Sequence, residues 1–207
     1  MSIRPSTTHR QMARTVIALT LAASLALGAI VVAGQASALA RVAPSTPTAA
    51  APHCLARVTG SAPSGELQLS TAACYATFAE VLQNAGYVVT NKKITPTEAL
   101  EQGFIGLKAP GSGGALSLSG GGIIGTHFDG FNSTGSSFSV WGSDCYGGYI
   151  NLTGFWANRV SSTLNGCPVV VHYYWPNLGG SSEALYGSGG NLSSLNNLSE
   201  SIAYTGW

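Results

Sequence analysis

The sequence predicts a mostly β architecture in two parts. An all-β sandwich of two Greek keys is expected over residues 123–207, and a small disulfide-bonded α+β module over residues 53–108 precedes it. Three observations lead to this prediction. The 207-residue chain is 45% hydrophobic but only 8% charged, and it contains 27 glycines, which is typical of short strands joined by many turns. Residues beyond 122 contain an internal repeat, and four cysteines are available for cross-links.

Residues 1–40 have the pattern of a secretory signal peptide. Three arginines lie among the first 14 residues, and an uncharged apolar run follows over 16–33. Two overlapping Ala-x-Ala sites predict cleavage after Ala40, or else after Ala38. An uncleaved signal anchor is the alternative, because an apolar run of 18 residues approaches membrane-spanning length. We expect a secreted, extracellular protein.

The charge of the mature chain argues against two kinds of partner. The three arginines leave with the signal, so six basic residues remain against eight acidic ones. Lys92-Lys93 is only a pair, and phosphate recognition requires larger basic clusters. We therefore expect no nucleic-acid partner, and no membrane association after signal cleavage.

The cysteines predict two disulfide bonds, since an even number of cysteines in an exported chain indicates a disulfide framework. Four cysteines allow three pairings. We favour Cys54–Cys74 and Cys145–Cys167, because each closes a loop of about twenty residues and would stabilise the fold by about 3 kcal/mol. Zinc is the alternative ligand, but the chain has no Cys-x-x-Cys pair to support it.

Two segments are predicted to be linkers. Residues 41–52 are rich in Pro, Ala and Thr, and residues 109–122 are rich in Gly and Ser. A glycine-rich segment can also cradle phosphate, but the Gly-Lys-Ser/Thr sequence that this needs is missing.

The module at 53–108 is predicted to combine paired strands with two helices. Alternating hydropathy indicates strands at 54–58 and 66–70. Apolar residues recur at helical spacing over 74–85, and Gly86 follows as a C-cap. A second, shorter helix would begin with the capping box of Thr95 and Glu98, with Pro96 in its first turn, and end at Gly103.

The internal repeat is the most informative feature of the chain. Residues 127–143 match residues 172–188 at an offset of 45, with seven identities in seventeen positions. Residues 156–162 then match 195–201 at an offset of 39, so the first copy carries about six extra residues. Two copies of about forty residues fit a pair of four-stranded Greek keys packed face to face.

Two motifs occur once in each copy. An aromatic-x4-aromatic-x-Gly pattern spans 128–135 and 173–180, with Ser133 and Leu178 in place of the second aromatic residue. An Asn/Asp-Asn/Asp-x-x-Ser/Thr-Ser pattern spans 157–162, where Ala157 departs from it, and 196–201, where Glu200 departs from it. On these residues, about 123–207 resembles the βγ-crystallin family, and more closely its secreted microbial members.

The resemblance implies two calcium sites at one end of the sandwich, each with oxygen ligands from both copies. The third motif position would supply the carbonyls of Arg159 and Leu198, and the fifth would supply Ser161 and Glu200. Calcium would bind with a dissociation constant of roughly 10⁻⁴ to 10⁻³ M. The alternative is that the Asn and Ser side chains merely hold turns. The candidate metal-site residues are Asn158, Arg159, Ser161, Asn196, Asn197, Leu198 and Glu200.

Catalytic motifs are lacking from the sequence. It contains neither a Gly-x-Ser-x-Gly elbow nor a His-Glu-x-x-His helix. His127 and His172 occupy equivalent repeat positions, which favours a duplicated packing role over an active site. Trp175-Pro176 is the best candidate for an exposed aromatic surface. Four Asn-x-Ser/Thr sequons are interpreted as incidental; they begin at Asn132, Asn151, Asn191 and Asn197.

These patterns predict a secreted, non-enzymatic binding or structural protein that binds calcium. Its partner would be an extracellular protein or a glycan. The alternative, suggested by some microbial relatives on this fold, is a proteinase inhibitor or a killer-toxin-like antimicrobial protein. The Cys145–Cys167 bridge beside the inserted segment 144–148 would then hold the inhibitory loop rigid.

Overall fold

A computed structural model describes residues 53–106 and 121–206. The signal peptide predicted at 1–40, the linker at 41–52 and most of the linker at 109–122 lie outside these residues. Within them, no helix is both long and apolar enough to cross a membrane.

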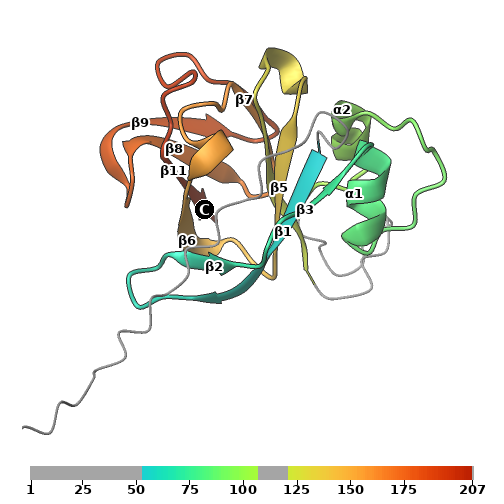
Figure 1. Ribbon diagram of the computed structural model, residues 1–207, viewed down its shortest axis with the longest axis horizontal. Coiled ribbons are helices and arrows are strands. Elements are labelled where there is room, and N and C mark those ends of the chain that lie inside the picture. Colours follow the sequence, from blue (N-terminus) through green and yellow to red (C-terminus); the bar gives the residue numbers. More distant parts are fainter. Residues whose placement is uncertain (1–52, 107–120, 207) are drawn as a thin grey trace, which may run out of the picture. The chain divides into compact units, whose positions relative to one another are not determined.

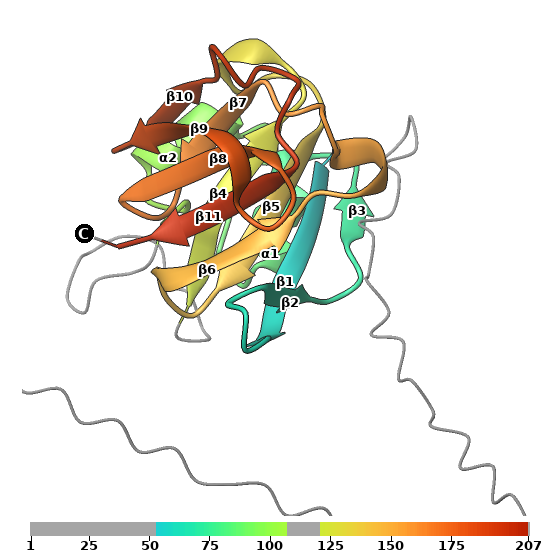
Figure 2. The same cartoon turned by 90° about the vertical axis from the view of Figure 1, so that its left-hand side faces the viewer.

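Two β-sheets form the body of the molecule. The first has the strand order β10-β7-β4-β5-β1-β2, with β3 also paired to β1. The second has the order β6-β11-β8-β9, and in Figure 2 this sheet faces the viewer. The strands of the first sheet are β1 (His53–Ser61), β2 (Leu67–Leu69), β3 (Ala73–Tyr75), β4 (Gly122–Phe128), β5 (Ser137–Gly142), β7 (Ser162–Asn165) and β10 (Gly189–Asn191). Those of the second are β6 (Tyr146–Asn151), β8 (Val169–Trp175), β9 (Gly179–Tyr186) and β11 (Ser201–Thr205).

The two sequence copies exchange their third strands. The first copy places β4, β5 and β7 in the first sheet but sends β6 to the second. The second copy places β8, β9 and β11 in the second sheet but sends β10 to the first. Each sheet therefore contains strands from both copies, so the two copies cannot separate without breaking the β7–β10 and β6–β11 ladders. The mostly β architecture predicted from the sequence is confirmed.

Two helices cover the outer face of the first sheet. They are α1 (Phe78–Asn84) and α2 (Pro96–Glu101), and the three layers are visible side by side in Figure 1. The burial of the strands is consistent with this three-layer arrangement. Every residue of β4 is buried, as expected for a strand covered on both faces, whereas β8 alternates between buried and partly exposed residues. Two short 3₁₀ turns, η1 (Phe131–Ser133) and η2 (Gly154–Trp156), complete the elements.

Residues 53–106 do not stand apart from the sandwich. Strand β1 pairs in parallel with β5, from His53 opposite Ser137 to Arg57 opposite Trp141. The sequence predicts separate modules at 53–108 and 123–207, whereas this ladder places strands of both in one sheet. The reason is physical: alternation along a strand indicates which face is buried but not which neighbour it pairs with.

The helix caps are mostly as predicted. Thr95 and Glu98 form a reciprocal capping box at α2, as their spacing indicates. Thr77 and Glu80 form an equivalent box at α1. The helix predicted over 74–85 therefore begins at Phe78, and the part of it around Cys74 is strand β3. Cys74 pairs with Cys54 across the β1–β3 ladder, which holds this segment extended.

Both predicted disulfides are present. Cys54–Cys74 joins β1 to β3, and Cys145–Cys167 joins the residue before β6 to the turn before β8. The second bond links the two sequence copies covalently. Two disulfides are typical of proteins that mature in an oxidising compartment.

Two hydrophobic clusters fill the spaces between the layers. The cluster between the sheets centres on Trp156, Phe138 and Tyr204, whose side chains are almost fully buried. The cluster between the first sheet and the helices contains Phe78 and Leu82 from α1, packed with residues of the sheet such as Ile123. Because strand β1 contributes to both clusters, through Cys54 and Leu55, we expect them to unfold together.

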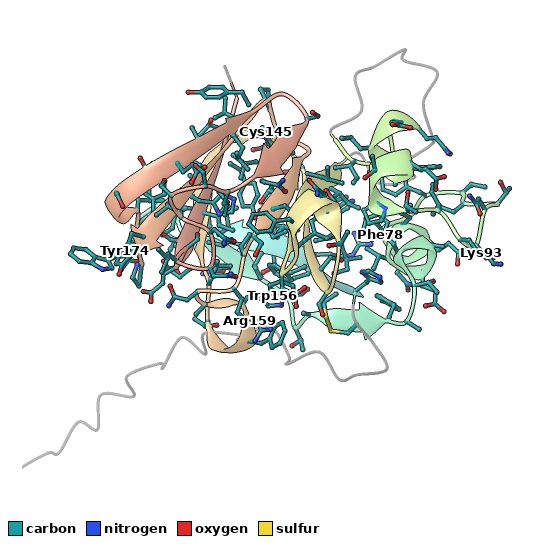
Figure 3. The ribbon with its side chains drawn as sticks, turned by 90° about the horizontal axis from the view of Figure 1, so that it is seen from above. Phe78, Lys93, Cys145, Trp156, Arg159 and Tyr174 are labelled. Carbon is teal, nitrogen blue, oxygen red and sulfur yellow. A yellow bond between two sulfur atoms is a disulfide. The ribbon has the colours of Figure 1, made fainter. Side chains whose placement is uncertain are left out.

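The substitution Phe78→Ala tests this cooperativity. Phe78 is 3% exposed and lies in the helix layer (Figure 3), so its loss should lower the free energy of unfolding by about 3–5 kcal/mol. Urea unfolding followed both by far-ultraviolet circular dichroism and by tryptophan fluorescence should still give one shared transition. The matched control is Val88→Ala, at a residue 67% exposed, which should change stability by less than about 0.5 kcal/mol. Two separated transitions would contradict a single folding unit.

Candidate functional site

The site begins with two hairpins that share one unusual backbone. The loop between β4 and β5 places Asn132, Ser133 and Gly135 at φ of 54°, 58° and 79°. The loop between β8 and β9 places Asn177, Leu178 and Gly180 at 56°, 62° and 76°. Glycine and asparagine tolerate this left-handed region better than most residues, which explains their recurrence at the offset of 45.

A serine fastens each hairpin to the sheet beneath it. Ser162 Oγ accepts a hydrogen bond from the N–H of Ser133 (3.0 Å) and donates to the carbonyl of Gly130 (2.6 Å). Ser201 Oγ accepts from the N–H of Leu178 (3.1 Å) and donates to the carbonyl of Trp175 (2.7 Å). These serines occupy the last position of each six-residue motif, so in each copy the motif is hydrogen-bonded directly to the hairpin.

Reciprocal asparagine pairs fix the exchanged strands to the hairpins. The N–H of Asn132 donates to Asn191 Oδ1 (2.6 Å), and Asn191 Nδ2 donates to Asn132 Oδ1 (2.8 Å). Asn177 and Asn151 make the same two bonds, at 2.7 and 2.9 Å. Each pair joins a hairpin to the strand that comes from the other copy. Three of the four sequon asparagines, Asn132, Asn151 and Asn191, therefore belong to these pairs.

The two six-residue motifs cross-contact each other. Their second residues, Asn158 and Asn197, have φ of 58° and 56°. The fifth residue of the first motif, Ser161, lies with its Oγ 3.2 Å from Asn197 Oδ1. The fifth residue of the second motif, Glu200, accepts a hydrogen bond at Oε1 from Asn158 Nδ2 (2.7 Å). In each direction, then, the fifth residue of one motif meets the second residue of the other.

Oxygen atoms converge at the first of these crossings. Ser161 Oγ lies 3.1 Å from the carbonyl oxygen of Asp129 as well as 3.2 Å from Asn197 Oδ1. The neighbouring Asn196 Oδ1 is buried without a hydrogen-bond partner. A hydroxyl, a carbonyl and amide oxygens are ligands that Ca²⁺ accepts, so these residues fit a hard cation. Since no three His, Cys, Asp or Glu side chains of the described chain gather at one point, a cation here would depend on neutral oxygens.

The second crossing fits a cation less well. Glu200 supplies a carboxylate, but Ala157 offers no side-chain oxygen where Asn196 stands in the other motif. The guanidinium of Arg159 turns away, lying 3.8 Å from Asp129 Oδ2 and 4.2 Å from the ring of Phe155. The carbonyls of Arg159 and Leu198 accept no hydrogen bond from any residue in the described ranges. Both therefore remain open to other partners.

Two acidic residues of the site were missed by the sequence reasoning. Asp129 contributes its carbonyl to the first crossing and accepts the N–H of Ser136 at Oδ1 (2.7 Å). Glu183 holds the turn before the second motif through hydrogen bonds from Ser193, Ser194 and Leu195. Although burial favours its neutral form, these bonds hold the pKa of Glu183 below its ordinary value. The repeat gives no signal for either residue, because Tyr174 and Phe138 stand at the matching positions.

A buried chain of hydrogen bonds lies beneath the two motifs. Tyr204 Oη is 2.8 Å from His127 Nε2, and His127 Nδ1 is 3.0 Å from Thr163 Oγ1. Thr163 Oγ1 is 2.9 Å from His172 Nε2, and His172 Nδ1 is 3.1 Å from Ser199 Oγ. Ser199 then donates to the carbonyl of Ser201 (3.3 Å). Because a carbonyl oxygen can only accept, Ser199 must donate to it and accept from His172 Nδ1–H. The same reasoning runs back along the chain, so each group donates towards Ser201. Both histidines are therefore inferred to be neutral, with the proton on Nδ1.

The two histidines are held neutral by burial. His127 and His172 are fully buried, with ring centroids 5.5 Å apart. Burial lowers the pKa of His172 to about 3, against a smaller opposing effect of Glu183. Burial, together with the charge that His172 would carry, lowers the pKa of His127 well below its ordinary value. Both ring nitrogens of each residue are occupied inside the core, so neither histidine is accessible to a dissolved substrate.

These histidines predict a loss of stability in mild acid. An unfolded histidine takes up a proton below about pH 6.5, whereas the buried ones resist protonation, so the unfolded state binds more protons. The free energy of unfolding should fall by about 2 kcal/mol per histidine between pH 7 and pH 5. Partly buried His53, whose pKa burial also lowers, acts in the same direction. Urea titrations at both pH values measure the change, and equal stabilities would contradict the neutral buried pair.

Comparisons with known proteins add no relative. No protein-family model, curated protein or solved structure matches this chain. Its function is therefore inferred from its own residues and from the differences between its two copies.

Proposed function

We propose that this chain is an exported, non-enzymatic binding protein whose residues 121–206 form a βγ-crystallin-like pair of Greek keys that binds calcium weakly. One observation carries the proposal: the two motifs meet through Ser161 with Asn197 and through Glu200 with Asn158. The two six-residue motifs, which the sequence shows only separately, therefore lie against each other in the fold. The exchange of β6 and β10 between the sheets further supports the Greek-key assignment.

Calcium would be held at the first crossing. Ser161 Oγ, the carbonyl oxygen of Asp129 and Asn197 Oδ1 are the proposed ligands, with Asn196 Oδ1 close by in sequence. A bound Ca²⁺ would supply positive charge that draws these oxygens together. The residues themselves come from the first hairpin and from both motifs, so the cation would stabilise the folded arrangement of all three.

A binding role is favoured over catalysis by the state of the titratable groups. The histidines are buried inside the sandwich, and each ring nitrogen already has a partner there.

The proteinase-inhibitor alternative is less well supported than the binding role. Residues 146–148 of the inserted segment at 144–148 belong to β6, and Tyr146 pairs with Thr205 of β11, so the segment is anchored to the second sheet and favours the inhibitory loop less.

Calcium should raise the melting temperature of the protein. With a dissociation constant of about 1 mM, 10 mM Ca²⁺ would stabilise the folded state by about 1.4 kcal/mol, or a few degrees. Differential scanning calorimetry in CaCl₂ and in chelator measures the shift. Ser161→Ala should abolish it, whereas Ser143→Ala, beyond the opposite end of β5, should retain it. Identical melting curves in calcium and chelator would remove the metal from the proposal.

Arg159 should weaken calcium binding by neutralising Asp129. Its guanidinium lies 3.8 Å from Asp129 Oδ2, so Arg159→Ala frees a negative charge beside the first crossing. We expect calcium to bind severalfold more tightly to this variant, measured by isothermal titration, because attraction between charges a few ångströms apart is worth about 1 kcal/mol near a surface. Arg57→Ala, which removes a cation on β1, serves as the control. Equal affinities in Arg159→Ala and the wild type would place the cation away from Asp129.

A further inference from the structure

The hairpin between β8 and β9 carries an exposed apolar surface. Tyr174, Trp175 and Leu178 are 39%, 58% and 37% exposed, and we call these three residues the aromatic platform. Tyr174 projects from the margin of the molecule in Figure 3, on the side opposite to Phe78. Large apolar side chains gathered on one exposed hairpin indicate a contact surface more often than chance exposure does.

The first copy shows that the fold does not require these side chains. Its hairpin has the same left-handed backbone and the same serine tie, but it carries Asp129, Gly130 and Ser133 at the matching positions. Polar or absent side chains therefore suffice to build this turn. The aromatic platform is an addition to the second copy that the turn itself does not require.

Leu178 strengthens this conclusion. Its φ of 62° lies in the left-handed region, which is unfavourable for a bulky residue, while Ser133 occupies the same conformation in the first copy. A leucine that is both strained and 37% exposed adds little to stability. It extends the apolar surface next to Trp175.

The platform is held rigidly. A Cβ atom on Gly180 would lie 3.5 Å from Trp175 Cδ2, and one on Gly179 would lie 3.3 Å from Trp175 Cβ, so the tryptophan packs against the backbone of these two glycines. Tyr174 stands at 67° to the indole with the ring centroids 5.8 Å apart. The indole is thus supported by backbone on one side, flanked by a tyrosine, and more than half exposed.

Polar side chains of the described residues adjoin the hairpin that carries the platform. Asn177 lies within the same hairpin and pairs with Asn151, which also donates to Glu66 Oε1 (2.9 Å). Tyr149 Oη lies 3.4 Å from Asn177 Oδ1. The hairpin that carries the apolar surface therefore also carries the exposed amide of Asn177, which suits a ligand that is itself apolar on one face and hydroxylated at its rim.

We propose that the aromatic platform binds the pyranose rings of a neutral polysaccharide. One face of such a ring presents C–H groups to an indole, and its hydroxyls lie at the edge, within reach of amides. A protein partner is less favoured, since three side chains on one hairpin fall short of the twenty or so residues of a stable interface. The inference gives the proposed binding role a ligand class, but it uses residues separate from the calcium ligands.

Depletion binding tests the proposal. The mature protein, residues 41–207, is mixed with microcrystalline cellulose, chitin and insoluble β-1,3-glucan, and the unbound fraction is measured by absorbance. We expect saturable binding to at least one of them, weakened at least tenfold in Trp175→Ser. Phe131→Ser is the matched control, because Phe131 is 48% exposed on the first hairpin, and it should bind as the wild type does. Circular dichroism and the melting temperature confirm that each variant is folded.

The outcomes separate this inference from the calcium proposal. All measurements are made both in calcium and in chelator, so loss of calcium stabilisation with retained sugar binding would remove only the metal. The platform assignment would be overturned if the wild type bound none of the three polysaccharides, or if Trp175→Ser bound as well as the wild type. Self-association that Trp175→Ser abolishes in sedimentation experiments without any sugar binding would also overturn it, since the surface would then be assigned to a second copy of the chain.

Discussion

The buried hydrogen-bond chain from Tyr204 to Ser201 is the constraint on which the arrangement depends. It passes from β11 to β4, to β7, to β8 and on to the second motif, so it crosses between the sheets and joins the two copies. A buried polar group that loses its partner costs about 1–3 kcal/mol, so slippage of one sheet would be penalised at several links. Thr163 follows the first motif directly and Ser199 lies within the second. The buried hydrogen-bond chain therefore fixes the position of one six-residue motif relative to the other and allows the contacts between them.

Hydrogen bonds between neutral polar groups, together with disulfides, make the connections that ion pairs make in many other proteins. Between residues that the structure describes, Arg159 and Asp129 form the one ion pair, with side chains 51% and 18% exposed. The asparagine pairs and the Cys145–Cys167 disulfide connect the copies instead, while the serine ties hold each hairpin within its own copy. Such contacts are insensitive to salt, because no net charge is screened. A composition with 8% charged residues is thus consistent with an ordered structure.

Local signals in the sequence were more informative than non-local ones. The capping box at Thr95, both disulfide pairings and the repeat at an offset of 45 follow from spacing alone. The pairing of β1 with β5 could not be predicted, because the two strands are far apart in the chain and strand pairing leaves no local pattern. Asn151 and Asn191 were assigned to incidental sequons for a similar reason. Their partners lie on the other copy's hairpin, and only the exchange of third strands brings them there.

Comparison of the two copies distinguishes residues that build the fold from residues that were added to it. Identical positions, such as Asn132 with Asn177 and Ser162 with Ser201, hold the same turns in both copies. Some positions that differ lie at the proposed sites. Asp129 contributes a carbonyl oxygen to the first motif crossing, while Tyr174, its counterpart, forms part of an exposed aromatic surface. Under the two proposals, this one position would bring a carboxylate beside the cation in the first copy and an aromatic ring to the ligand in the second, on a hairpin backbone that glycine, asparagine and serine fix in both.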